Sequence, residues 1–456
     1  MTDSQVYSRL KDNEGVIMGR PQGAVAVTGK KFFGIDVLEG LTRRDFYNLY
    51  GDTFIVGILL IIPSIIQPLF LQEVIGIPRQ LAGSINSGLQ NMSQLATFLF
   101  IGYAGTLSDQ YGRVMLSFWG FLLTGICYLI FGYAKPIAGL LGVNLIAFTY
   151  LCRFLVAAGF VAMWPQFSTL AADYTLYKDR GKAMAYNGLM LGLGGVVVFI
   201  LLSKLPQHFG VMILFYISAA ASLVGAVWIK LTLKDRLPEV RARKRNIKVI
   251  YRIVSKSMAL KISYVGVLIA RADQMILGTL VMVWAINAAR SYGVSHGNAA
   301  ALAGTALGMQ MIASVILTPL IGQLIDRIGR VPIIIWSLLL GGLGYFMLGY
   351  VDNPFSKWVW VAVSVTGVSQ GTVNMASNAL AANVSPKPLL GSILGGKNSM
   401  APVGTFIFLQ LAGFFFDRYG AAVAFYMKGA VNLGTFLWVL LICKRVVEEE
   451  IVYQPD

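Results

Sequence analysis

Between two long apolar runs the chain reads Gly105-Thr106-Leu107-Ser108-Asp109-Gln110-Tyr111-Gly112-Arg113. A second copy, Gly322-Gln323-Leu324-Ile325-Asp326-Arg327-Ile328-Gly329-Arg330, follows 217 positions later and is again flanked by apolar runs. Both copies have the pattern Gly-x-Leu-x-Asp-x-x-Gly-Arg. A polar turn that recurs at matching places in a hydrophobic chain predicts two homologous halves.

Each copy has a carboxylate and a glycine where a membrane helix would meet water. Asp109 and Asp326 are placed where a carboxylate can cap the N-terminus of a neighbouring helix. Gly112 and Gly329 permit the chain to reverse within a few residues. The alternative is a plain polar turn with an Asp–Arg surface pair.

The two stretches resemble the loops between helices 2 and 3, and between helices 8 and 9, of the major facilitator superfamily. The chain departs from the usual pattern at Gln110, Val114 and Val331. The resemblance implies two parallel repeats of six helices, with a substrate site between them at mid-membrane. It also implies that the turns brace the halves on the cytoplasmic side in one state and release them in the other. The residues expected in this gating role are Gly105, Asp109, Gly112, Arg113, Gly322, Asp326, Gly329 and Arg330.

The composition is that of a membrane protein that crosses the bilayer many times. Hydrophobic residues make up 56% of the chain and charged residues 13%, too few charges to cover a soluble protein of 456 residues. No signal peptide is evident in the polar first forty-five residues. The three cysteines lie inside apolar runs, which argues against a disulfide framework.

A membrane-spanning helix needs roughly 20 mostly apolar residues, and the chain offers two sets of six such runs. We therefore predict an all-α membrane protein with 12 transmembrane helices in two pseudo-symmetric six-helix bundles. The expected spans are 52–71, 81–105, 114–133, 144–170, 182–203 and 211–231, then 261–289, 298–322, 332–350, 358–383, 392–416 and 421–443.

The segments outside the bundles divide the chain into five parts. Residues 1–45 are expected to be a cytoplasmic tail, residues 232–260 a basic cytoplasmic linker and residues 444–456 a second cytoplasmic tail. The bundles occupy 46–231 and 261–443. The apolar stripe from Leu38 to Leu49 fits a helix on the membrane surface, and an unstructured lead-in to the first span is equally compatible.

The distribution of Lys and Arg sets the orientation. With both termini inside, the cytoplasmic segments hold 27 of the 37 basic residues and the external loops hold six. This placement explains the net charge of +16 without a nucleic-acid partner. The protein is expected in the plasma (inner) membrane.

Two arginines fall in the middle of expected spans, where a charge is costly and therefore suggests function. Arg153 lies about ten residues into span 4, roughly 14 Å deep at 1.5 Å per residue. Arg271 lies about as far into span 7 from the opposite side, so both reach the midplane. A guanidinium holds a carboxylate or phosphate with two parallel hydrogen bonds. The alternative is that both arginines only tie helices together.

Asp273 is the candidate for a coupling proton site, since a buried carboxyl group can bind and release a proton during transport. Its alternative role is a structural pair with a lysine on another span. Asp52 is expected at the aqueous mouth of span 1, where a carboxylate carries little information. The other predicted substrate-binding residues are polar groups on spans of both halves, namely Gln67, Gln166, Asn374 and Lys397.

No pattern for enzyme chemistry emerges. Residues 391–398 nearly match a phosphate-binding loop, but Asn398 replaces the hydroxyl residue that would hold magnesium, and no buried strand precedes it. His208 and His296 fall in external loops. We expect no catalytic residue, no metal and no cofactor.

The expected function is secondary active transport of a small solute by alternating access, coupled to protons. The two midplane arginines favour a small organic anion as substrate. The alternatives are efflux of a lipophilic or cationic compound, or a membrane scaffold or assembly factor that keeps the transporter fold. The expected partners are the substrate, the lipid bilayer and protons, with the protein as a monomer.

Overall fold

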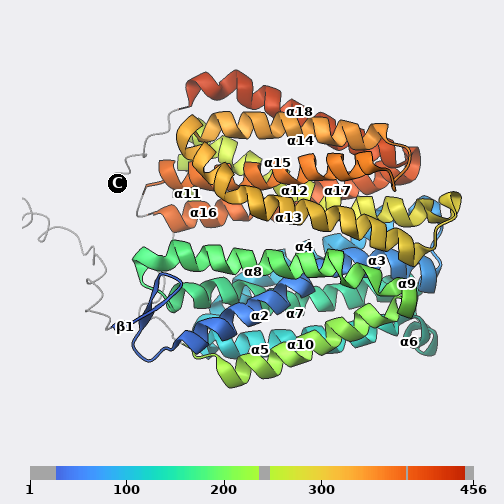
Figure 1. Ribbon diagram of the computed structural model, residues 1–456, viewed down its shortest axis with the longest axis horizontal. Helices are drawn as coiled ribbons and strands as arrows, with labels where there is room; N and C mark the ends of the chain where they lie inside the picture. The colour runs from blue at the N-terminus through green and yellow to red at the C-terminus, as the bar shows by residue number, and fades with distance from the viewer. Residues whose placement is uncertain (1–26, 236–246, 387–388, 447–456) are drawn as a thin grey trace, which may run out of the picture.

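The computed structural model describes residues 27–235, 247–386 and 389–446 (Figure 1). The basic run Arg236–Arg245 and most of both predicted tails lie outside these residues. The described chain forms two bundles of helices that lie side by side, the first in blue to green and the second in yellow to red.

The first bundle follows a short β-hairpin of strands β1 (Val27–Phe32) and β2 (Ile35–Leu38). Its helices are α2 (Arg43–Ile61), α3 (Pro63–Phe70), α4 (Ala82–Tyr111), α5 (Arg113–Gly132), α6 (Ala134–Leu141), α7 (Leu145–Asp173), α8 (Arg180–Ile200), α9 (Pro206–Phe209) and α10 (Met212–Thr232). Short helices η1 (Leu71–Ile75), η2 (Arg79–Leu81), η3 (Tyr177–Asp179) and η4 (Leu202–Lys204) join them.

The second bundle repeats this order after the linker helix α11 (Ile247–Lys256). Its helices are α12 (Met258–Ala288), α13 (His296–Ile328), α14 (Arg330–Tyr350), α15 (Lys357–Val384), α16 (Leu390–Asn398), α17 (Met400–Tyr419) and α18 (Ala421–Ile442). Short helices η5 (Ala289–Tyr292) and η7 (Cys443–Arg445) complete it.

Ten helical segments of the described chain are long and apolar enough to cross a membrane. The remaining two predicted spans are α4 and α15, which have 30 and 28 residues. Both carry several amide side chains, which lowers their apolar character. The predicted all-α membrane fold of two six-helix bundles is confirmed.

The repeated polar stretch is not a turn along its whole length, which corrects the sequence-based expectation. Residues 105–111 form the last two turns of α4, and residues 322–328 those of α13. The chain reverses only at Gly112 and Gly329, whose φ angles are 97° and 100°. A residue with a side chain rarely adopts these angles.

Within the described residues, the buried hydrophobic core joins the two bundles at one end. A hydrophobic cluster continues from the first bundle into the second through buried residues such as Leu280, Ala303 and Phe416. The opposite end of the second bundle has a separate cluster that includes Leu260, Ile325 and Ile393. We call the joined end the closed end, and the end with Gly112 and Gly329 the turn end.

The hairpin packs against the turn end of the first bundle (Figure 1). The ring of Phe32 stacks on Phe46 and Tyr50, with centroids 5.1 and 5.8 Å apart. The Tyr186 hydroxyl on α8 donates a hydrogen bond to the carbonyl of Phe33 at 3.2 Å. The stretch from Leu38 to Leu49, for which a surface helix and an unstructured lead-in were equally compatible, ends a strand at Leu38 and enters α2 at Arg43.

Candidate functional site

A cavity of about 260 Å³ lies between the two bundles. The first bundle contributes residues of α2, α3, α4 and α8 to its wall, and the second contributes residues of α12, α13 and α15. The polar lining residues include Ser64, Gln90, Arg271, Gln274, Thr279, Gln310, Ser314, Gln370 and Asn374. Both halves of the repeat thus meet at one site.

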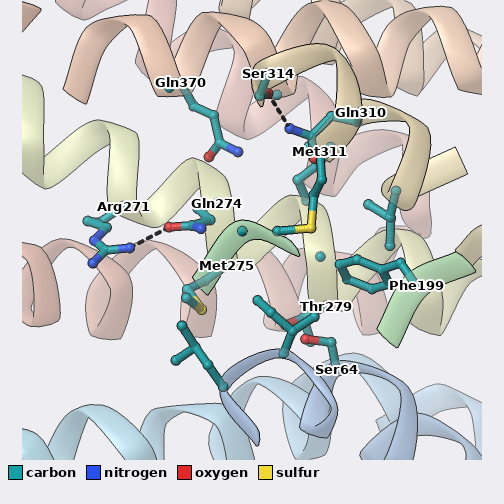
Figure 2. Close-up of a pocket in the computed structure, with 18 of the residues that line it drawn as sticks. Ser64, Phe199, Arg271, Gln274, Met275, Thr279, Gln310, Met311, Ser314 and Gln370 are labelled. Atoms are coloured by element: carbon teal, nitrogen blue, oxygen red, sulfur yellow. Dashed lines mark hydrogen bonds between the residues drawn. The ribbon is translucent and has the colours of Figure 1, made fainter. Parts of the chain in front are cut away.

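The cavity is lined by a mixture of polar and apolar side chains. In Figure 2 the guanidinium of Arg271 lies on the left, close to the amide of Gln274. Phe199 and Met311 lie on the right. Among the described residues that line the cavity, Arg271 carries the only charge.

Arg271 has an amide as its partner. Its Nη1 donates a hydrogen bond to Oε1 of Gln274, one helical turn further along α12, at 2.5 Å. Within the described part of the chain, no carboxylate pairs with Arg271. Its positive charge is therefore not neutralised by a neighbouring acid.

Arg153 reaches the cavity through Gln90. The arginine on α7 is 5% exposed, and its Nη2 lies 3.5 Å from Oε1 of Gln90. Its Nε has no hydrogen-bond partner, and no carboxylate of the described residues pairs with it. Nε2 of Gln90 lies 3.4 Å from the sulfur of Met275 on α12, so Gln90 links the two bundles.

The other predicted binding residues are divided between the cavity and its surroundings. Asn374 lines the cavity and accepts a hydrogen bond from Asn378 at 3.4 Å. Gln67, Gln166 and Lys397 are buried but are not among the lining residues. Lys397 donates a hydrogen bond to Asn378. Sequence reasoning did not select Gln274, which the spacing of three from Arg271 could have suggested.

Asp273 faces away from the cavity, toward α14 and α18. Its Oδ1 lies 2.5 Å from Nζ of Lys428, which is fully buried. Nδ2 of Asn432 donates to both carboxylate oxygens, at 3.2 and 3.0 Å. The geometry is that of the structural pair considered as the alternative for this residue.

Asp52 is not at an aqueous mouth, which corrects the sequence-based expectation. The residue is 0% exposed, and neither of its carboxyl oxygens has a hydrogen-bond partner among the described residues. It lies nine residues into α2, which continues beyond the predicted start of span 1 toward the turn end. Asp52 is thus a buried acid without a fixed partner in the first bundle.

The first repeated turn is held by an acid from another part of the chain. Oδ1 of Asp235, beyond the end of α10, accepts hydrogen bonds from the N–H groups of Arg113 and Val114 at 2.6 and 3.0 Å. The Arg113 side chain pairs with Asp173 and lies 3.7 Å from Asp109. The capping group on α5 is therefore Asp235, and Asp109 is 59% exposed.

The second turn has the same backbone and more open surroundings. Asp326 is exposed, and Gly322 has Met375 of the same bundle near its backbone. Around Gly105 the space is open.

The sequence matches the Major Facilitator Superfamily over residues 52–292 and again over 263–452. The magnetosome protein MamH of Paramagnetospirillum magneticum is 29% identical over 88% of this chain and 93% of its own length. Magnetosome protein MamZ of the same organism is 26% identical over 90% of this chain and 65% of its own length.

Relatives with other names are more distant. Multidrug resistance protein 2 of Bacillus subtilis is 23% identical over 82% of this chain and 88% of its own length. A crystal structure of a POT family transporter with a thioalcohol-conjugated peptide matches over 91% of this chain and 97% of the transporter chain. The TM-score is 0.70 with 14% identical residues, a likeness of fold.

Proposed function

The chain belongs to the major facilitator superfamily, and from this premise we propose that it transports a small organic anion across the membrane by alternating access. The observation that carries the proposal is the pair of arginines, one in each bundle. Arg271 lines the cavity and Arg153 contacts the lining residue Gln90. Neither has a carboxylate partner among the described residues, so an anionic substrate would supply the missing charge.

The cavity also limits the alternatives. A cationic substrate is disfavoured because the described lining residues include an arginine and no carboxylate. Efflux of a neutral lipophilic compound remains the second candidate, favoured by Phe199 and Met311 in the wall and by relatives named as multidrug resistance proteins.

The orientation of the protein in the membrane is proposed from packing and charge together. The Lys and Arg distribution supports a cytoplasmic turn end. Since the bundles separate at that end, we propose that this conformation faces inward. The N- and C-termini would then both be cytoplasmic.

The compartment is proposed from the relatives. Two proteins that match 88% and 90% of the chain are named as magnetosome proteins. We propose that this protein lies in the inner membrane or in a magnetosome membrane. A scaffold or assembly role in such a membrane is the alternative to transport.

Proton coupling is proposed to use a carboxyl group that is not fixed in an ion pair. Asp52 meets this condition, because its oxygens are buried without partners. Asp273 is the second candidate, since it would have to leave Lys428 to exchange a proton. Asp52 is on the same helix as the lining residues Leu60 and Ile61, so a change at Asp52 can reach the cavity.

The experiment is a ligand screen of the purified protein, followed by flux into liposomes. We expect monocarboxylates or other organic anions to raise the unfolding temperature, and a pH gradient to drive their accumulation. A best ligand that is cationic or neutral would contradict the anion proposal. Complete absence of both ligand stabilisation and flux would favour the scaffold.

A further inference from the structure

Helix α4 starts at the closed end without a capping side chain of its own. Its N-cap residue is Leu81, whose apolar side chain cannot accept a hydrogen bond from the first N–H groups of the helix. The first N–H groups of a helix have no partner within the helix. Here Oδ1 and Oδ2 of Asp417 accept hydrogen bonds from the N–H groups of Gly83 and Ser84, each at 2.7 Å. Asp417 is on α17, so the cap comes from the opposite bundle.

The backbones of the two helices approach closely beside this cap. A methyl group on Gly83 would lie 2.6 Å from the carbonyl oxygen of Gly413, and one on Gly413 would lie 2.4 Å from Oγ of Ser87. Two turns further along α4, Asn91 donates to the carbonyl of Phe406 at 3.1 Å. The seam between α4 and α17 thus extends from the closed end toward the middle of the protein.

The related seam in the other half of the repeat is capped differently. Helix α13, the counterpart of α4, has its own N-cap residue, Ser295, whose hydroxyl accepts from the N–H of Asn298 at 3.2 Å. Asp417-Arg418-Tyr419-Gly420 corresponds to Gln207-His208-Phe209-Gly210, so a neutral amide stands in the place of the carboxylate. The cap from the opposite bundle is therefore specific to the α4–α17 seam.

We propose that Asp417 holds the closed end shut by capping α4 across the two bundles. When the bundles separate at this end, both hydrogen bonds break and α4 loses its cap, whereas α13 keeps Ser295. Asp417 is thus a positioning residue that sets the balance between the conformation described here and one open at this end. The proposal goes beyond the proposed function, because it requires no particular substrate.

The size of the effect follows from helix capping. Replacing an N-cap acid by alanine changes an equilibrium constant by roughly 2- to 30-fold. Asp417→Ala should shift the ratio of shut to open molecules by about this factor toward open. Asp417→Asn should shift it less, because an amide oxygen still accepts one hydrogen bond and asparagine is a good N-cap residue.

The measurement uses the full chain in lipid nanodiscs without ligand, in a background with Cys443→Ser. One pair of spin labels is attached to cysteines that replace the exposed residues Leu141 and Tyr350 near the closed end. A second pair is attached to cysteines that replace Tyr111 and Ile328 at the turn end. In Asp417→Ala we expect longer distances in the first pair together with shorter distances in the second. Unchanged distributions in Asp417→Ala would overturn the proposal.

Two controls separate this role from a general loss of stability. Ser295→Ala removes a cap within one bundle, so it should lower the unfolding temperature without changing the distances. An equal shift in Ser295→Ala and Asp417→Ala would also overturn the proposal. Gly413→Ala should open the closed end by crowding Ser87, whereas Gly139→Ala, with open space around it in α6, should not.

Discussion

The carboxylate of Asp273 and the ammonium of Lys428 form a buried ion pair, with Oδ1 and Nζ 2.5 Å apart. The pair joins α12 to α18 and lies outside the cavity lining. Asp273 is two residues from Arg271, and its charge is already neutralised by Lys428. The carboxylate nearest in sequence to Arg271 is therefore not its counter-ion.

Lys428→Met should lower the free energy of unfolding strongly. Removing one member of a buried ion pair costs about 3–5 kcal/mol, because the remaining charge loses its counter-ion. The double variant Asp273→Leu/Lys428→Met should recover much of this loss. Thermal unfolding in detergent measures both. Lys357→Met, which alters an exposed lysine, is the control, and equal unfolding temperatures for Lys428→Met and Lys357→Met would contradict the assignment.

Gly112→Ala should be more destabilising than Gly329→Ala. Both glycines have backbone angles that alanine rarely adopts, which costs of the order of 1–3 kcal/mol. At Gly112 the added methyl group would also lie 2.4 Å from Asp235 Oδ2, whereas at Gly329 the nearest atom, Cδ of Pro332, is 3.6 Å away. Comparing the unfolding temperatures of the two variants tests the difference, and a larger loss at Gly329 would count against it.

The sequence predicted those features that depend on local pattern. Apolar runs located the helices, and the recurrence of the Gly112 turn at Gly329 predicted the two halves. Other features depend on how distant helices face one another. The cap from Asp417 to Gly83 joins residues more than three hundred positions apart. No periodicity in α17 indicates that relationship.

The burial of acidic residues was also not predicted correctly from the sequence. Asp52 is close to the predicted start of span 1, so it appeared to be near water. In the structure α2 begins at Arg43, the hairpin packs beside it, and Asp52 is covered. The hairpin itself has few residues, and its strands gave no alternation strong enough to distinguish them from an irregular tail.

The hairpin should loosen in acid. The hydrogen bond from Lys178 lowers the pKa of the Asp36 carboxyl below its ordinary 3.8, and the same bond raises the pKa of Lys178 above 10.5. The stabilisation from Asp36 is present above pH 3.8 and is lost as pH falls through its lowered pKa. The stabilisation from Lys178 is lost only at pH values above 10.5.

A spin label at the exposed position Lys30 would report this change. We expect the label to become more mobile once the pH falls below the lowered pKa of Asp36 than it is at pH 7. In Asp36→Asn the label should be mobile at both pH values, because the ion pair is absent. A label that is no more mobile after Asp36 has been protonated than at pH 7 would show that the pair does not hold the hairpin.

Asp52→Asn should abolish uphill accumulation of substrate and leave exchange of substrate across the membrane intact. The reason is that an amide cannot carry a proton, while binding and the conformational change do not need one. Flux into liposomes with and without a pH gradient distinguishes the two processes. Asp273→Asn is the comparison, and if it alone removes uphill transport, the coupling group is Asp273.

Arg271→Gln should weaken binding of the anionic substrate sharply. Loss of one charged hydrogen-bonding partner of a buried anion costs about 2–5 kcal/mol, or roughly 30- to 5,000-fold in affinity. Arg271→Lys should restore only part of the affinity, because an ammonium cannot form the two parallel hydrogen bonds of a guanidinium. Arg153→Gln should have a smaller effect, since Arg153 contacts the cavity through Gln90.

Titration of the purified variants with the best anion from the screen measures these affinities directly. Arg290→Gln is the matched control, because it removes an exposed arginine that does not line the cavity. An unfolding temperature for Arg271→Gln close to that of the control would show that the loss is one of binding. If Arg271→Gln and Arg153→Gln both bind the anion as the unchanged protein does, these arginines only join helices, and the anion must be held by the amides of the cavity.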